Sequence, residues 1–167
     1  MKSTVLILAI LVSLCADESH AQGCARVKGR QSIFRTVGVI RGQVHLGAPL
    51  PPAVATVSPG DTVVPLPAGT FTGADSLTIH LTLAGNVRAL TFVYAPAANF
   101  AALVADYQKT LGHGPVAVGD GPESHSVRYC WQDKQTYFAI EQQTRFGQTS
   151  IRSILLDRKG RPSTRSG

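Results

Sequence analysis

The sequence of 167 residues predicts an α+β protein in which one amphipathic helix packs on a face of an antiparallel β-sheet. One stretch, residues 99–111, has apolar positions at helical spacing and clear signals at both ends. Runs of alternating polarity, separated by turn residues, lie before and after it. From residue 76 onward these patterns give the order β-β-α-β-β-β, with the helix on one sheet face.

An apolar run over residues 5–16 opens the chain and is followed by Ala21, a small residue at the position that signal peptidase prefers. Residues 1–21 are therefore predicted to be a cleaved signal peptide, and the mature chain to be periplasmic or secreted. The run is shorter than the roughly 20 apolar residues that a membrane span needs. A lipid anchor at Cys15 is the rival interpretation, which Leu14 disfavours because a lipoprotein signal has a small residue before its cysteine.

Two cysteines, Cys24 and Cys130, remain after cleavage. An oxidising compartment favours a disulfide between them, and two free thiols are the alternative. A bond that closes a loop of about a hundred residues would stabilise the fold by up to about 4.7 kcal/mol in the chain-entropy description.

Positive charge gathers at the two ends of the mature chain. Residues 61–157 hold six basic and eight acidic side chains, whereas residues 22–60 and 158–167 hold basic side chains and no acidic ones. Such ends can contact an anionic surface or serve as solvated tails. Nucleic acid is not expected, because aromatic residues for base stacking are scarce there. The candidate anionic-surface contacts are Arg26, Lys28, Arg30, Arg35, Arg158, Lys159, Arg161 and Arg165.

The chain is predicted to have four parts. Residues 31–46 are apolar enough for a strand, and prolines and glycines then interrupt the chain up to residue 75, with one helical turn expected from Pro51. The parts are a signal peptide (1–21), a basic N-terminal arm with a Pro/Gly-rich segment (22–75), an α+β core (76–157) and a basic disordered tail (158–167).

The predicted core begins with a hairpin. Residues 77–83 alternate apolar and polar side chains, as in a strand with one buried face. Gly85 and Asn86 break this run, and residues 87–94 return as a second strand. Both faces of the second strand are mostly apolar, which predicts a position inside the sheet.

The helix is predicted to begin after Asn99, whose side chain can cap the first turn, and to end at Gly112. His113 follows the end and is expected to be exposed or to contact carbonyl groups of the last turn. The helix should pack on the preceding hairpin. Its buried stripe comprises Phe100, Leu103, Val104, Tyr107 and Leu111.

The segment after the helix, residues 116–124, is predicted to be a loop. Val127, Tyr129 and Trp131 should share one side of the next strand, with Arg128 and Cys130 on the other side. Short turns separate this strand from two more, so that an antiparallel meander closes the sheet. The three strands are expected over residues 126–131, 136–143 and 150–157.

No catalytic, cofactor-binding or metal-ligating residues are assigned, because the sequence has no zinc, nucleotide-binding or nucleophile-elbow motif. Ser124, His125 and Ser126 lie near Asp120 and Asp133 in the sequence. Neighbours on an extended segment point to opposite faces, so these residues predict a turn rather than a catalytic triad.

Paired carboxylates for glycoside hydrolysis are also hard to nominate. Glu123 and Glu141 are the glutamates of the mature chain, and their separation in space does not follow from the sequence. Glu141 alternates with Tyr137 and Ala139, which predicts a solvated strand face.

The layout resembles small bacterial envelope domains, namely the SmpA/OmlA-type lipoproteins and the β-lactamase inhibitor-like repeats. The resemblance covers residues 76–157 and depends on Leu46-Gly47, a strand pair, a helix that ends in "LGHGP" and a "WQD" turn before a threonine. It implies a non-enzymatic role in the cell envelope, such as holding another protein on a sheet face.

The sequence therefore predicts an exported, non-enzymatic binding or accessory protein of the bacterial cell envelope. A small hydrolase acting on an envelope polymer and a module that docks on anionic lipid are the alternative hypotheses.

Overall fold

The computed structural model describes residues 23–27, 36–39, 42–54, 62–65 and 73–158. The predicted signal peptide and lipid-anchor position Cys15 lie outside these ranges. So do six of the candidate anionic-surface contacts, namely Lys28, Arg30, Arg35, Lys159, Arg161 and Arg165.

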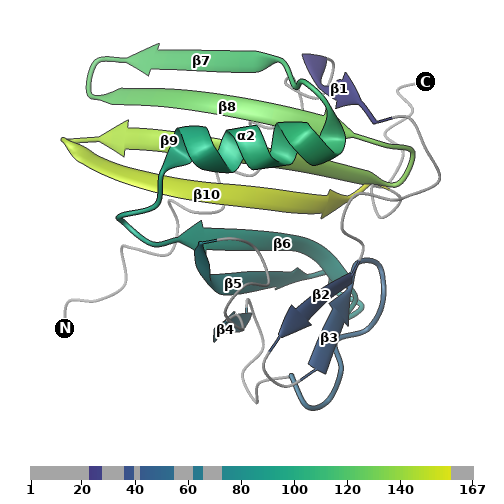
Figure 1. Ribbon diagram of the computed structural model, residues 1–167. Coiled ribbons are helices and arrows are strands. Elements are labelled where there is room, and N and C mark those ends of the chain that lie inside the picture. The colour runs from purple at the N-terminus through teal and green to yellow at the C-terminus, as the bar shows by residue number, and fades with distance from the viewer. Residues whose placement is uncertain (1–22, 28–35, 40–41, 55–61, 66–72, 159–167) are drawn as a thin grey trace, which may run out of the picture.

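The described elements form a mostly antiparallel sheet with one helix, α2 (Phe100–Leu111), on one face (Figure 1). The α+β prediction is thereby confirmed. From one edge to the other the strands are β4 (Thr62–Pro65), β5 (Ala74–Leu81), β6 (Val87–Tyr94), β10 (Gln148–Asp157), β9 (Thr136–Arg145) and β8 (Ser124–Gln132).

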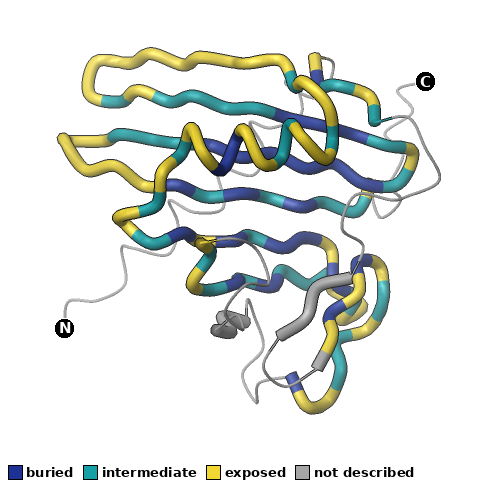
Figure 2. The backbone as a smooth tube through the Cα atoms, in the orientation of Figure 1, coloured by how far each residue is buried: buried dark blue, intermediate teal, exposed yellow. Residues whose placement is uncertain are grey.

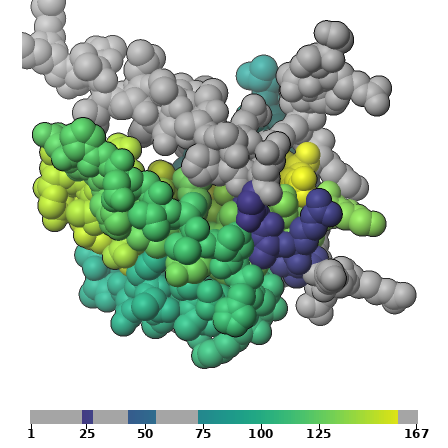
Figure 3. Space-filling view, turned by 90° about the horizontal axis from the view of Figure 1, so that it is seen from above, coloured from purple at the N-terminus to yellow at the C-terminus, as the bar shows by residue number. Residues whose placement is uncertain are grey.

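Two strands share the outer edge of β8 (Figure 3). β7 (Val116–Gly121) pairs antiparallel with residues 124–129 of β8. β1 (Ala25–Arg26) pairs parallel with Trp131 and Gln132, further along the same strand. A separate hairpin, formed by β2 (Thr36–Val39) and β3 (Gly42–His45), replaces the single strand predicted over residues 31–46.

The segment before residue 76 also contributes to the main sheet and to its core. β1 and β4 are members of the sheet, and Val44, Leu46 and Val54 are buried in the principal apolar cluster. At Pro51 the chain makes a turn closed by a hydrogen bond from the Val54 N–H to the Pro51 carbonyl, 2.9 Å long. The helical turn predicted from this proline runs on into residues that the structure does not describe.

The loop predicted over residues 116–124 is wrong, because residues 116–121 form strand β7 and β8 begins at Ser124. All six residues of β7 are exposed, so no alternation of buried and exposed positions marks the strand. Its glycines have a packing reason: a Cβ on Gly119 would lie 2.8 Å from the Ser126 hydroxyl, and one on Gly121 would lie 2.9 Å from the Ser124 hydroxyl. β7 is therefore held in the sheet by backbone pairing with β8, and its amino-acid composition does not predict this pairing.

The helix begins and ends as predicted. Asn99 caps its first turn by accepting a hydrogen bond from the Ala102 N–H, with 3.1 Å between N and Oδ1. Gly112 follows the last turn with a φ of 85°, which a residue with a Cβ adopts only at a cost. His113 is exposed. The Gly112 carbonyl accepts a 2.8 Å hydrogen bond from the Trp131 indole N–H, so Trp131 supplies a donor to the backbone at the C-terminal end of the helix.

The helix was predicted to pack on the preceding hairpin, but its ring contacts are with β8 and β9, and a hydrogen bond between Tyr107 and Tyr94 links it to β6 of the hairpin. The rings of Tyr107 and Phe138 are 4.8 Å apart between centroids, and Tyr107 and Trp131 are 6.3 Å apart. The reason is the connection: three strands separate β6 from β7, so the chain passes over the face of those strands, and α2 lies along that face (Figure 1).

The principal core is formed by α2, the main sheet and the segment from β3 to Val54, and the strands show a buried centre in Figure 2. β6 has strands on both sides and buried residues on both faces, as predicted for an internal strand. The side chains with no exposed surface are those of Leu77, Ile79, Leu90, Phe92, Trp131, Phe138, Ile140 and Leu155, together with Val44 and Ser153.

Two tyrosines make a hydrogen-bonded chain inside this core. The Tyr94 hydroxyl lies 2.7 Å from that of Tyr107 and 2.9 Å from that of Ser153. Burial raises the pKa of both tyrosines above its ordinary value near 10. Because the fold favours the neutral phenols, this contribution to stability is present below pH 10 and is lost as the pH rises above it.

The Tyr107→Phe variant should therefore lose less stability than the parent chain between pH 7 and pH 11, because it has one buried phenol fewer to ionise on unfolding. Urea unfolding at the two pH values measures the difference. An equal loss in both proteins would contradict the assignment.

Candidate functional site

The sheet face away from α2 carries a group of polar and charged side chains from three adjacent strands. Direct pairing places Arg128 of β8 opposite Glu141 of β9, and Glu141 opposite Arg152 of β10. Gln143 lies two positions after Glu141 on β9, and Arg145 lies two positions after Gln143. Successive residues of a strand alternate between faces, so these five side chains share one face. We call this set, Arg128, Glu141, Gln143, Arg145 and Arg152, the arginine face.

The centre of the arginine face is an ion-pair cluster. Arg152 donates to Glu141 Oε2 through Nε at 3.1 Å and through Nη2 at 3.0 Å. Arg128 Nη2 donates to Glu141 Oε1 at 3.4 Å. The Glu141 side chain is 9% exposed, against 16% for Arg128 and 35% for Arg152. The carboxylate is therefore enclosed between two guanidinium groups, one of which reaches the surface.

The solvated position predicted for Glu141 is wrong. Its alternation with Tyr137 and Ala139 is real, but both of these residues are themselves buried. Together with Ile154 and the ion-pair cluster, they line a small hollow. An ionised carboxylate in such a position requires partners, and the two arginines on the neighbouring strands supply them.

The arginine face has more positive charge than negative charge. Three arginines accompany one glutamate, which leaves an excess of two positive charges. Arg145 is exposed near the end of β9, and the Gln143 amide oxygen, oriented toward it, accepts from its Nε at 3.0 Å and its Nη2 at 3.1 Å. Guanidinium groups held in this manner are suited to carboxylate ligands, which they bind in a bidentate geometry.

The predicted disulfide between Cys24 and Cys130 is present. Cys130 lies on β8 and shares the sheet face of Arg128, and the bond packs with Tyr137 and Ala139 in a second, smaller apolar cluster. The bond therefore attaches the N-terminal strand β1 to the end of the face opposite to Arg145.

Two of the predicted anionic-surface contacts are described. Arg26 is exposed on β1. Arg158 donates a hydrogen bond from Nη1 to the Asp133 carbonyl and another from its backbone N–H to the Gln135 carbonyl, at 2.5 Å and 2.7 Å. Arg158 thus joins the end of β10 to the turn between β8 and β9.

The structure brings His125 together with Asp120, one of the two aspartates that lie near it in the sequence. His125 Nδ1 lies 2.5 Å from Asp120 Oδ1 across the β7–β8 ladder. Both side chains are more than half exposed. Ser124 and Ser126 lie on strand β8, not in the predicted turn, and face the opposite side of the sheet from His125.

The other acidic candidate, Asp133, lies at the far end of β8 and caps the turn that follows. It accepts hydrogen bonds from the Gln135 and Thr136 N–H groups, each 2.6 Å long. His80 pairs with the Thr91 hydroxyl at 2.9 Å. Trp131 is buried and Tyr129 is half-buried, both on the side of β8 that they were predicted to share.

Across the described ranges, no group of three or more histidine, cysteine, aspartate or glutamate side chains is placed to hold a metal ion. Within the same ranges, no helix is both long enough and apolar enough to cross a membrane.

No protein-family model, no curated protein and no solved structure matches the chain.

Proposed function

We propose that this chain is an exported, non-enzymatic binding protein that holds an acidic polypeptide against the arginine face. The observation that carries the proposal is the single carboxylate of Glu141 between Arg128 and Arg152, with Arg145 further along the same face. One internal glutamate balances one arginine, and the face keeps an excess of positive charge, with Arg145 exposed, that attracts a carboxylate of the partner. The disulfide agrees with a protein that functions in an oxidising compartment.

Binding to labelled poly-L-glutamate, followed by fluorescence anisotropy at low salt, tests this proposal. The Arg145→Gln and Arg152→Gln variants should each bind about fivefold more weakly, since a partly exposed charge pair is worth about 1 kcal/mol. Arg88→Gln is the matched control, because Arg88 is an exposed arginine whose alternation on β6 places it with Leu90 and Phe92, on the opposite sheet face.

If all three substitutions weaken poly-L-glutamate binding equally, the binding is nonspecific electrostatic attraction and the proposal is overturned. Vesicles that contain phosphatidylglycerol test the alternative hypothesis of docking on anionic lipid. If the arginine variants lose vesicle binding while poly-L-glutamate does not bind the parent protein, the partner is a lipid surface and the polypeptide proposal fails. Circular dichroism of each variant establishes that it is folded.

A further inference from the structure

The turn between β9 and β10 has an unusual residue at its first position. Arg145 pairs directly with Gln148, so Phe146 and Gly147 are the two residues of the loop. Their φ angles are 49° and 76°, which is the signature of a type I′ turn. Among the described residues, Phe146 is the one residue other than glycine with a positive φ.

Neither the backbone nor the burial of Phe146 favours phenylalanine there. Type I′ turns strongly prefer asparagine, aspartate or glycine at this position, because a bulky side chain is strained in the left-handed region. Phe146 as a whole residue is also 78% exposed, so its side chain gains little from leaving water. Strained, exposed residues of this kind occur at binding sites, where a partner supplies the missing contacts.

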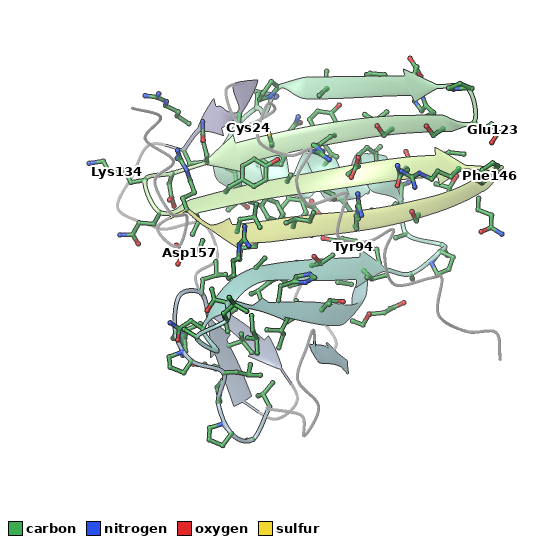
Figure 4. The ribbon with its side chains drawn as sticks, turned by 180° about the vertical axis from the view of Figure 1, so that it is seen from behind. Cys24, Tyr94, Glu123, Lys134, Phe146 and Asp157 are labelled. Atoms are coloured by element: carbon green, nitrogen blue, oxygen red, sulfur yellow. A yellow bond between two sulfur atoms is a disulfide. The ribbon has the colours of Figure 1, made fainter. Side chains whose placement is uncertain are left out.

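The turn is held in place by its neighbour. The Phe146 N–H donates to the carbonyl of Glu123 in the β7–β8 turn, at 3.2 Å. In Figure 4, Glu123 and Phe146 lie together at one end of the sheet, while Lys134 and Asp157 lie at the other. The aromatic ring is therefore presented from a fixed position, which lowers the entropy lost when a partner binds.

Phe146 is continuous with the arginine face. An open depression beside the turn is lined by Phe146 together with Gln143 and Arg145, which belong to that face, and with polar residues of β10. A polypeptide that reaches the arginine face with a carboxylate at Arg145 would thus have its next side chains within reach of the exposed ring.

We propose that Phe146 is the apolar anchor of this binding surface, and that the partner is an acidic polypeptide with an aromatic or aliphatic side chain next to its carboxylates. This inference builds on the proposed function. Aromatic residues commonly dominate binding at such surfaces, whereas the charged residues around them contribute association rate and selectivity.

A comparison of two probes separates the anchor from the arginines. Phe146→Asn should bind a random copolymer of glutamate and tyrosine about tenfold more weakly than the parent protein does. The same variant should bind poly-L-glutamate as the parent does, because that polymer has no apolar side chain. Phe146→Tyr keeps the ring and should retain binding to both.

Thermal unfolding supplies a readout that a structural role of Phe146 would not give. Asparagine suits the turn, so Phe146→Asn should raise the melting temperature by about 2–4 °C while it weakens copolymer binding. Leu83→Asn is the control for loss of an exposed apolar side chain, since Leu83 lies in the β5–β6 turn at the opposite end of the sheet. It should leave binding to both probes unchanged.

The possible outcomes distinguish the two proposals. If Arg145→Gln and Arg152→Gln weaken binding but Phe146→Asn does not, the anchor is wrong and the proposed function stands. If none of the three variants affects either probe, both proposals fail. If Phe146→Asn lowers the melting temperature and weakens both probes, Phe146 has a structural role and the anchor is again wrong.

Discussion

Replacement of Trp131 with alanine is expected to lower the free energy of unfolding by about 3–5 kcal/mol, the range for large aromatic residues in a core. The Trp131 side chain has no exposed surface. Its ring stacks on Phe138 at 5.9 Å between centroids, and its indole N–H satisfies the Gly112 carbonyl at the end of α2. The substitution therefore removes core packing and one contact between helix and sheet together.

Urea unfolding followed by far-ultraviolet circular dichroism measures this effect. Trp131→Phe is the companion variant: it keeps an aromatic ring but loses the hydrogen bond, and should cost about 1–3 kcal/mol. A loss below 1 kcal/mol for the alanine variant would show that the helix does not depend on this residue, and would contradict the described packing.

Removal of the disulfide is expected to have the second large effect. The Cys24→Ser, Cys130→Ser double variant should lose about 2–5 kcal/mol, because the bond joins residues 106 positions apart and strongly restricts the unfolded chain. The bond also attaches β1, a strand of two residues, to the sheet. Loss of the pairing between β1 and β8 would destabilise the folded state, in addition to the effect of the missing bond on the unfolded chain.

Denaturant unfolding of the chain without residues 1–21, with and without dithiothreitol, provides the measurement. The reductant should bring the parent chain to the stability of the double variant and should leave the double variant unchanged. A reductant effect on the double variant, or none on the parent, would be incompatible with a stabilising bond between these two cysteines.

The helix and the internal strand were predictable because each has a complete local signal. The apolar stripe, the Asn99 cap and the Gly112 stop define α2, and the observed bounds agree with them. β6 spans the predicted residues 87–94, since Gly85 and Asn86 mark the turn before it. In these elements, burial and backbone preference favour the same structure.

β7 was not predictable in the same way, because its side chains make no contribution to the core. Its exposed valines, Val116 and Val118, alternate with small residues, and its two glycines suggest a turn. The strand exists through its backbone pairing with β8, which depends on how distant parts of the chain meet. Local composition carries no record of that pairing.

The arginine face could have been found in part. A two-residue loop in the "RFGQ" turn pairs Arg145 with Gln148, and counting back along the ladder then brings Arg152 opposite Glu141. The alternation along β9 alone predicts a solvated Glu141, because the arginines that enclose its carboxylate lie on the two neighbouring strands. Contact with Arg128 depends on a second register, that of β8 on β9, which is harder to predict because four residues, and not two, separate the last paired residues of this turn.

The crossover from β6 through α2 to β7 has a consequence for the order of assembly. β10 lies between β6 and β9, so among the described strands residues 148–157 pair with both and join the two halves of the sheet. Strand pairing can unite the two halves only once β10 is in place. Much of the sheet therefore depends on pairing between β10 and a strand far away in the sequence, and such non-local contacts favour slow folding.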